Sequence, residues 1–122
     1  MNKKAILTIL GIIVIILGGI LAVNYFSAPA TGTDLTEFAQ CLSAKDTTMY
    51  GAYWCTHCQA QKALFGEAFK YVPYVECTED ANKCLEKGVS KFPTWIIKGE
   101  KLEGEQTLQL LSEKTGCELP ED

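Results

Sequence analysis

Apolar positions fall into one continuous block followed by short periodic groups. The block, AILTILGIIVIILGGILAV, runs from Ala5 to Val23 and holds no charged residue. A helix of this length covers about 28 Å, close to the ~30 Å hydrocarbon core of a bilayer. The pattern therefore predicts a transmembrane helix over residues 5–23 and one small folded domain over residues 34–122.

The flanks of the apolar block predict its orientation. Lys3 and Lys4 precede it and the next basic residue is Lys45, so the positive-inside tendency places residues 1–4 in the cytoplasm and the domain on the extracytoplasmic side, periplasmic or cell-surface. A cleaved secretory signal is the alternative, because residues 28–30 (APA) have the small-x-small form. The block exceeds the about 7–15 residues of a signal core, which favours an uncleaved anchor. Both interpretations export the domain.

After the block, residues 24–33 (NYFSAPATGT) are small, polar and broken by Pro and Gly, which predicts a linker. In the domain, helical periodicity then alternates with short β-branched and aromatic runs. The predicted order is helix 34–44, strand 47–53, helix 55–71, strand 72–77, helix 79–87, strand 94–98, strand 101–103 and helix 105–114. Such an order predicts a three-layer α/β sandwich with a mixed central sheet.

Charge argues against one class of partner. The domain carries nine lysines against fifteen acidic residues and no arginine, a formal charge of −6. Nucleic-acid binding needs a basic face to neutralise phosphates, so we expect no nucleic-acid partner.

All six cysteines lie in the predicted exported domain. They are Cys41, Cys55, Cys58, Cys77, Cys84 and Cys117. An even count in a small exported domain indicates disulfides. Fixing one adjacent pair leaves three ways to join the other four cysteines, and the spacing alone does not choose among them.

The stretch Cys55-Thr56-His57-Cys58 lies where a predicted strand enters a predicted helix. Free backbone N–H groups and the positive end of the helix dipole favour a thiolate there. One helical turn places Cys58 behind Cys55, where it can resolve a mixed disulfide. A zinc site would need four ligands, usually with a second pair of close ligands, so no metal is expected. A purely structural disulfide between Cys55 and Cys58 would close a very short loop and add little stability. Redox chemistry is therefore favoured.

His57 is the only histidine in the chain. Between the two cysteines, its imidazole can donate a hydrogen bond or charge to the Cys55 thiolate, which makes the disulfide a stronger oxidant. The alternative is an exposed histidine with no role.

These motifs resemble the thioredoxin superfamily, through Trp54 and the CxxC after a strand and Phe92-Pro93-Thr94 opening a later one. More narrowly, the chain resembles the thioredoxin-like domain fused to bacterial and archaeal homologues of vitamin K epoxide reductase. The resemblance covers residues 38 to 117 through FAQCL (38–42), MYGAYWCTHCQAQKALFGEAF (49–69), YVEC (74–77), FPTW (92–95) and TGC (115–117).

The resemblance implies a thioredoxin-like fold, with Cys55 as nucleophile, Cys58 as resolving cysteine and Pro93 as a cis-proline beside them. A cis X-Pro bond fixes a kink that would leave the Phe92 backbone free to pair with an extended substrate. A trans proline that merely opens the strand is the alternative. Substrate contacts are then expected at Trp54, Phe92 and Thr94.

The resemblance also has a departure. Thioredoxins carry a buried acid six residues before the first active-site cysteine, and Met49 stands there instead. Deprotonation of Cys58 must therefore use another group, either water or a nearby glutamate.

The remaining four cysteines are predicted to form structural disulfides, Cys77–Cys84 and Cys41–Cys117. The first joins a strand end to the next helix, and the second joins the ends of the first and last helices. A rival hypothesis makes Cys77–Cys84 a second redox pair that passes electrons to Cys55–Cys58.

The sequence thus predicts a membrane-anchored thiol–disulfide oxidoreductase that oxidises exported cysteine-containing proteins. The expected reoxidising partner is a membrane quinone reductase of the vitamin K epoxide reductase type, and no cofactor beyond the cysteines is expected. The alternatives are an extracytoplasmic disulfide reductase and a disulfide-stapled binding module without exchange activity.

Overall fold

The computed structural model describes residues 2–26 and 33–121 of the chain. The chain divides into two compact units, Met1–Gly32 and Thr33–Asp122. The small-x-small stretch at residues 28–30 and most of the predicted linker lie outside the described residues.

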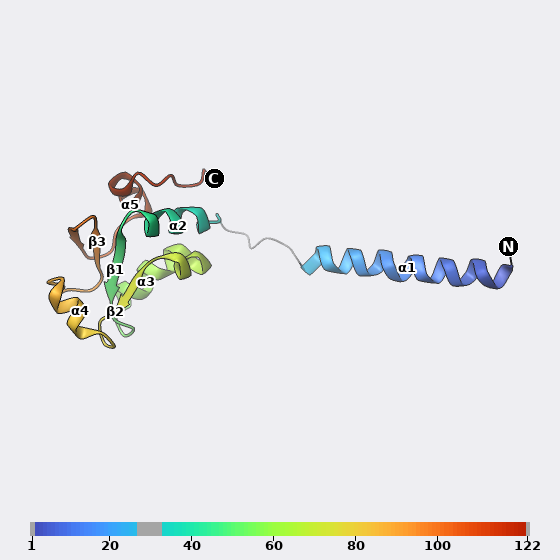
Figure 1. The fold of residues 1–122 in the computed structure, drawn as a ribbon, viewed down its shortest axis with the longest axis horizontal. Helices are drawn as coiled ribbons and strands as arrows, with labels where there is room; N and C mark the ends of the chain where they lie inside the picture. The colour runs from blue at the N-terminus through green and yellow to red at the C-terminus, as the bar shows by residue number, and fades with distance from the viewer. Residues whose placement is uncertain (1, 27–32, 122) are drawn as a thin grey trace. The chain divides into compact units, whose positions relative to one another are not determined.

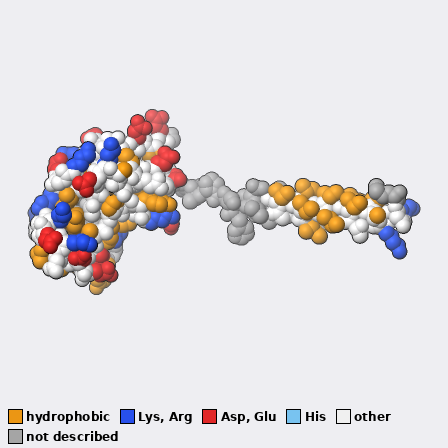
Figure 2. Space-filling model, in the orientation of Figure 1, with side chains coloured by type: hydrophobic (Ala, Val, Ile, Leu, Met, Phe, Trp, Pro, Cys, Tyr) orange, Lys and Arg blue, Asp and Glu red, His pale blue; other side chains and the backbone are white. Residues whose placement is uncertain are grey.

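The first unit contains helix α1, Lys3–Phe26. Its stretch Lys3–Ile20 has a mean hydropathy of 2.2 and is long and apolar enough to cross a membrane, a criterion that an N-terminal signal sequence also meets. The side chains of this stretch are not buried, and apolar ones cover its surface (Figure 2). The helix continues through residues 24–26, which the sequence assigns to the linker, because backbone hydrogen bonds can extend a helix past its apolar stretch.

The second unit follows the predicted order of elements (Figure 1). Its helices are α2 Thr36–Ala44, α3 Thr56–Phe65, the 3₁₀ segment η1 Gly66–Tyr71, α4 Ala81–Glu86 and α5 Leu108–Thr115. Its strands are β1 Thr47–Gly51, β2 Tyr74–Glu76, β3 Thr94–Ile97 and β4 Glu100–Glu103.

The four strands form one mixed sheet in the order β2-β1-β3-β4. β1 runs parallel to β2 and antiparallel to β3, and β3 pairs with β4 as an antiparallel hairpin. Parallel pairing of β1 and β2 follows from the helical crossover between them, and the β3–β4 hairpin follows from its tight turn at Lys98-Gly99. This is the mixed sheet that the sequence predicts.

Alternation along the strands divides the core between the two faces of the sheet. On one face, Met49 of β1 and Trp95 of β3 pack with residues of α2, α3 and α5 in the larger buried cluster. On the other face, Tyr50 packs with Cys84 of α4 in a smaller cluster. The domain is therefore a three-layer α/β sandwich of thioredoxin-like fold. The larger cluster makes one face of the sheet the thick face, and the smaller cluster makes the other the thin face.

Local chemistry explains where the helices differ from the prediction. The helix expected over 55–71 breaks at Gly66, whose φ of 54° ends α3 and starts η1. The last helix begins at Leu108 because the Thr107 side chain caps it by accepting from Leu110 N. Asp34 contributes to the first helix by accepting from Thr36 N at 2.9 Å.

Candidate active site

The start of α3 holds two unbonded cysteines close together. Cys55 is the N-cap residue of α3, and its sulfur accepts a hydrogen bond of 3.2 Å from Cys58 N–H. Cys55 retains 7% of its surface, whereas Cys58 retains none. Both are free thiols. Cys55 is thus the sulfur that a substrate can reach, and Cys58 lies behind it.

Gly51, the last residue of β1, lets the strand pass close beneath this turn. A Cβ built on Gly51 would lie 2.9 Å from Cys58 Sγ, closer than side-chain atoms normally approach. Glycine is therefore required where the strand meets the buried thiol.

Burial is the main influence on the acidity of Cys58. Loss of solvent, together with the hydrogen bond to Cys55, raises the pKa of the Cys58 thiol to about 12. In the reduced protein Cys58 therefore keeps its proton. Any reaction that breaks or forms a bond at the Cys58 sulfur must then move a proton.

Pro93 forms a cis peptide bond with Phe92, and its side chain is fully buried. The Trp54 ring is 59% exposed and meets the Phe92 ring edge-on, with centroids 6.1 Å apart. The Trp54 and Phe92 side chains are thus in contact.

Thr94 differs from the other two expected substrate contacts. Its side chain is 1% exposed, and its hydroxyl donates to the Lys91 carbonyl at 2.7 Å. That hydroxyl holds the turn before β3, so the Thr94 side chain is not placed for contact with a substrate.

His57 lies on the exposed side of the turn. Its Nδ1 pairs with Glu105 Oε1 at 2.5 Å, and 73% of its side chain is exposed. The contact that the structure gives His57 is therefore with Glu105, a residue that the sequence does not single out.

Gln61 fixes the loop that carries Glu105. Its fully buried amide donates to the Gln106 carbonyl at 3.0 Å and accepts from Gln106 N and Trp95 Nε1. Gln61 follows His57 by one helical turn, so both side chains of α3 hold the same loop.

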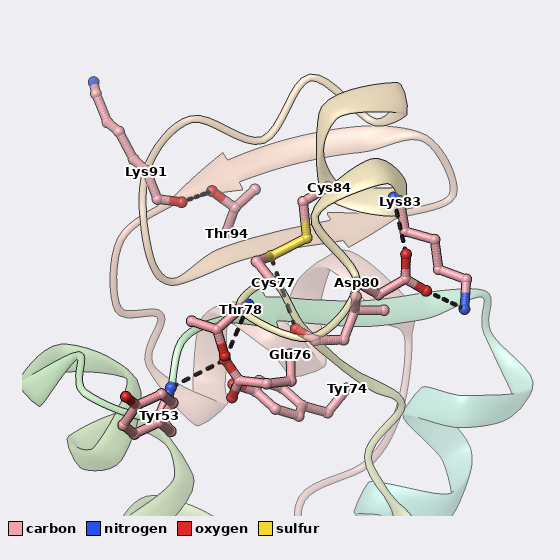
Figure 3. The surroundings of a disulfide bond; sticks show 11 residues. Tyr53, Tyr74, Glu76, Cys77, Thr78, Asp80, Lys83, Cys84, Lys91 and Thr94 are labelled. Atoms are coloured by element: carbon pink, nitrogen blue, oxygen red, sulfur yellow. Dashed lines mark hydrogen bonds and ion pairs between the residues drawn. A yellow bond between two sulfur atoms is a disulfide. The ribbon is translucent and has the colours of Figure 1, made fainter.

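Glu76, like Glu105, is a residue of the site that the sequence analysis does not name. One carboxylate oxygen accepts from Tyr53 N at 3.1 Å and from the Thr78 hydroxyl, and the other accepts from the Tyr74 hydroxyl at 2.8 Å (Figure 3). Burial opposes ionisation, but these hydrogen bonds outweigh it and lower the pKa of Glu76. An ionised Glu76 thus ties β2 to the loop before Cys55.

The other four cysteines form two disulfides. Cys41 of α2 is bonded to Cys117, which follows α5, across 76 positions of sequence. Cys77 at the end of β2 is bonded to Cys84 of α4 (Figure 3). These are the two pairs that the sequence predicts.

A mixed four-stranded sheet, a dithiol at the N-terminus of the helix after β1 and a cis-proline before β3 together define the class. The arrangement is that of the thioredoxin-like fold, with a pair of free thiols where a strand enters a helix.

Over 90 residues the chain is 43% identical to the thiol-disulfide oxidoreductase LTO1 of Arabidopsis thaliana. The match covers 66% of this chain and 24% of that protein, so the chain spans about a quarter of its relative's length. No family model matches the chain.

Solved thioredoxins are also similar. The thioredoxin NaTrxh of Nicotiana alata is 20% identical with a TM-score of 0.44, over 61% of this chain and 76% of that one. The oxidised thioredoxin of Plasmodium falciparum is 19% identical with a TM-score of 0.46, over 65% of this chain and 90% of that one.

Proposed function

We propose that this protein is a membrane-anchored, extracytoplasmic thiol–disulfide oxidoreductase that donates the Cys55–Cys58 disulfide to exported proteins. A substrate thiolate attacks Cys55, and Cys58 leaves as the sulfur–sulfur bond breaks. A second substrate thiolate then attacks the substrate sulfur of the mixed disulfide and releases Cys55. The substrate gains a disulfide and the protein is left as a dithiol.

The observation that carries this proposal is the contrast among the six cysteines. Four are joined in two disulfides, while Cys55 and Cys58 are unbonded at a helix N-terminus, where Cys55 keeps 7% of its surface exposed and Cys58 keeps none. The Cys58 N–H group donates to Cys55 Sγ at 3.2 Å, which places a hydrogen-bond donor at the sulfur that is attacked and later released.

Substrate binding in this proposal uses Trp54 and the segment before the cis-proline. Phe92 makes no backbone hydrogen bond of its own within residues 33–121, so its N–H and C=O can pair with an extended substrate segment. The exposed Trp54 ring offers apolar contact beside the reacting sulfur.

Placement outside the cytoplasm rests on α1 and on the two lysines before it. Two disulfides in a small domain suit an oxidising compartment. We further propose that a membrane quinone reductase of the vitamin K epoxide reductase type reoxidises the dithiol, since a membrane anchor would hold both partners in one plane. The two sulfurs carry the electrons, so the proposal requires no organic cofactor.

The test is the reduction potential of Cys55–Cys58 in the full chain in detergent, measured by equilibration with glutathione and alkylation mass spectrometry. A value of about −120 to −180 mV, typical of disulfide donors, supports the proposal. A value near −270 mV, as in thioredoxin, would identify a reductant and reverse the electron flow. A pair that never exchanges would leave a binding module.

A further inference from the structure

The buried thiol of Cys58 needs a path for its proton. Met49, six residues before Cys55, is fully buried and apolar, so it supplies none. On the same face of the sheet, β2 pairs Tyr74 with Met49. The residue paired with the position where an acid is missing thus carries a phenol hydroxyl.

Gly51 shows how near that hydroxyl lies to Cys58. A Cβ on Gly51 would be 2.9 Å from Cys58 Sγ and 3.2 Å from the Tyr74 hydroxyl oxygen. The sum, about 6 Å, is the upper limit of their separation. A direct hydrogen bond after a small movement, or one bridging water, spans such a gap.

The Tyr74 hydroxyl also contacts a residue that reaches solvent. It donates to Glu76 at 2.8 Å, and Glu76 is partly exposed at the end of β2. Glu76 is itself held by Tyr53 N–H and by the Thr78 hydroxyl (Figure 3). The phenol therefore stands between the buried sulfur and a fixed carboxylate that reaches solvent.

Burial keeps the Tyr74 phenol in its neutral form. Burial, with the hydrogen bond to Glu76, raises the pKa of Tyr74 well above its usual range. Lys62 Nζ lies 3.7 Å from the centre of the Tyr74 ring, and its charge favours a thiolate on Cys58. Among the described residues, the charged or titratable groups that act on Cys58 and Tyr74 are Cys55, Lys62 and Glu76.

We propose that Tyr74 carries the proton to and from Cys58, with Glu76 as the residue that positions its hydroxyl. This inference rests on the proposed thiol–disulfide exchange. When a substrate thiolate bonds to Cys55, the electron pair of the broken sulfur–sulfur bond passes to Cys58. For this step the Tyr74 O–H turns from Glu76 to Cys58, gives its proton to that sulfur and takes a proton from water in the same step. Tyrosine is unchanged overall, and the reverse reaction uses the same path.

The test compares Tyr74→Phe with wild type in the reaction of the oxidised full-length protein with dithiothreitol, followed by stopped-flow tryptophan fluorescence. Phenylalanine keeps the ring that packs against Phe69 and Lys62. We expect the rate constant to fall about tenfold, within the range of positioned proton transfer. The equilibrium constant with glutathione should stay within about twofold, because proton delivery changes the rate and not the end states. Tyr71→Phe removes a phenol hydroxyl elsewhere in the domain and is the matched control.

A lower rate constant with an unchanged equilibrium constant in Tyr74→Phe supports the relay, because damage to the fold would change both constants. Equal rates for Tyr74→Phe and wild type overturn the relay but leave the exchange activity standing. Parallel losses in rate and equilibrium also overturn it. A wild-type protein inert to dithiothreitol overturns the proposed function itself.

A second measurement needs no variant. Proton transfer in the step that frees Cys58 predicts a slower wild-type reaction in deuterated water, by about twofold, after correction for thiol ionisation of the reductant. A corrected rate ratio of one would contradict the relay even if Tyr74→Phe failed to fold.

Discussion

Two short stretches of the domain each hold a pair of cysteines, yet only one pair is bonded. Cys77 and Cys84, seven positions apart, are joined by a disulfide, whereas Cys55 and Cys58, three positions apart, are free. The first pair links the end of β2 to α4 on the thin face of the sheet. The second lies on the thick face, within the first turn of α3.

The difference teaches that surroundings set the use of a cysteine pair. Cys77 and Cys84 close a loop over a small buried cluster, where a covalent bond adds stability that packing does not supply. Cys55 Sγ accepts a backbone N–H at 3.2 Å, and the residue keeps 7% of its surface exposed, so this free thiol is the one of the pair that another thiol could approach.

Replacing Cys55 should have the largest effect on the difference between the two cysteine pairs. Cys55→Ser should abolish catalysed exchange with dithiothreitol or a reduced protein substrate, because the other unbonded cysteine among the described residues, Cys58, has no exposed surface. Cys58→Ser should instead trap a mixed disulfide, detectable by mass spectrometry. The double variant Cys77→Ala/Cys84→Ala serves as control and should keep exchange. Residual exchange in Cys55→Ser comparable to wild type would contradict this assignment.

Removing each structural disulfide sharpens the comparison between the faces. By loop-closure entropy, loss of Cys41–Cys117 should lower the free energy of unfolding by about 4–5 kcal/mol, and loss of Cys77–Cys84 by about 2–3 kcal/mol. The larger value follows from the sequence separation of 76 against 7. Urea unfolding of the two paired alanine variants would measure both.

The same variants test the rival role of Cys77–Cys84. A structural bridge leaves the Cys55–Cys58 reduction potential unchanged when it is removed. Loss of electron transfer to Cys55–Cys58 in Cys77→Ala/Cys84→Ala, with the fold intact, would make it a second redox pair.

Alkaline pH should reveal the buried thiol. The pKa of Cys58 is raised from 9.0 to about 12 in the folded reduced protein. Above pH 9 the unfolded chain ionises Cys58 while the folded one keeps its proton, so this contribution to stability is present below pH 9 and is lost between pH 9 and 12. Urea unfolding of the reduced protein should show a steeper decline in wild type than in Cys58→Ser. Parallel declines would show that burial does not hold the proton.

Substitution of the exposed His57, between the two cysteines, should give the smallest effect. His57→Gln removes the imidazole that pairs with Glu105 and should lower the reduction potential by about 30 mV, a tenfold change in the equilibrium constant with glutathione. Glu105→Gln should shift it less and in the opposite direction, because the negative charge is removed. Glu100→Gln, which breaks the exposed pair with Lys114, is the matched control. A shift in the control as large as in His57→Gln would show a general charge effect.

Much of this domain could be predicted from local patterns. Periodicity and turn residues gave each helix and strand to within a few positions, because these depend on neighbours a few residues apart. The largest difference, the break of the predicted helix at Gly66, follows from a backbone conformation with φ of 54° that periodicity does not reveal. Cys55, Cys58 and Pro93 could be named from motif and resemblance.

The groups around the dithiol depended on the tertiary structure. Glu105 reaches His57 across 48 positions, Gln61 holds Gln106 across 45, and Glu76 holds Tyr53 across 23. None of these residues carries a local signal, since isolated Gln, Glu and Tyr are ordinary surface or core residues.

The sequence by itself determined the order of elements, the apolar N-terminal helix and the CxxC at a strand-to-helix junction, because periodicity and spacing are written along the chain. Only the tertiary structure decided that Tyr74 would stand over Gly51 beside Cys58, and that Thr94 would be buried. Pairing of β1 with β2 and β3 sets those positions, and strand pairing joins residues that no local pattern connects.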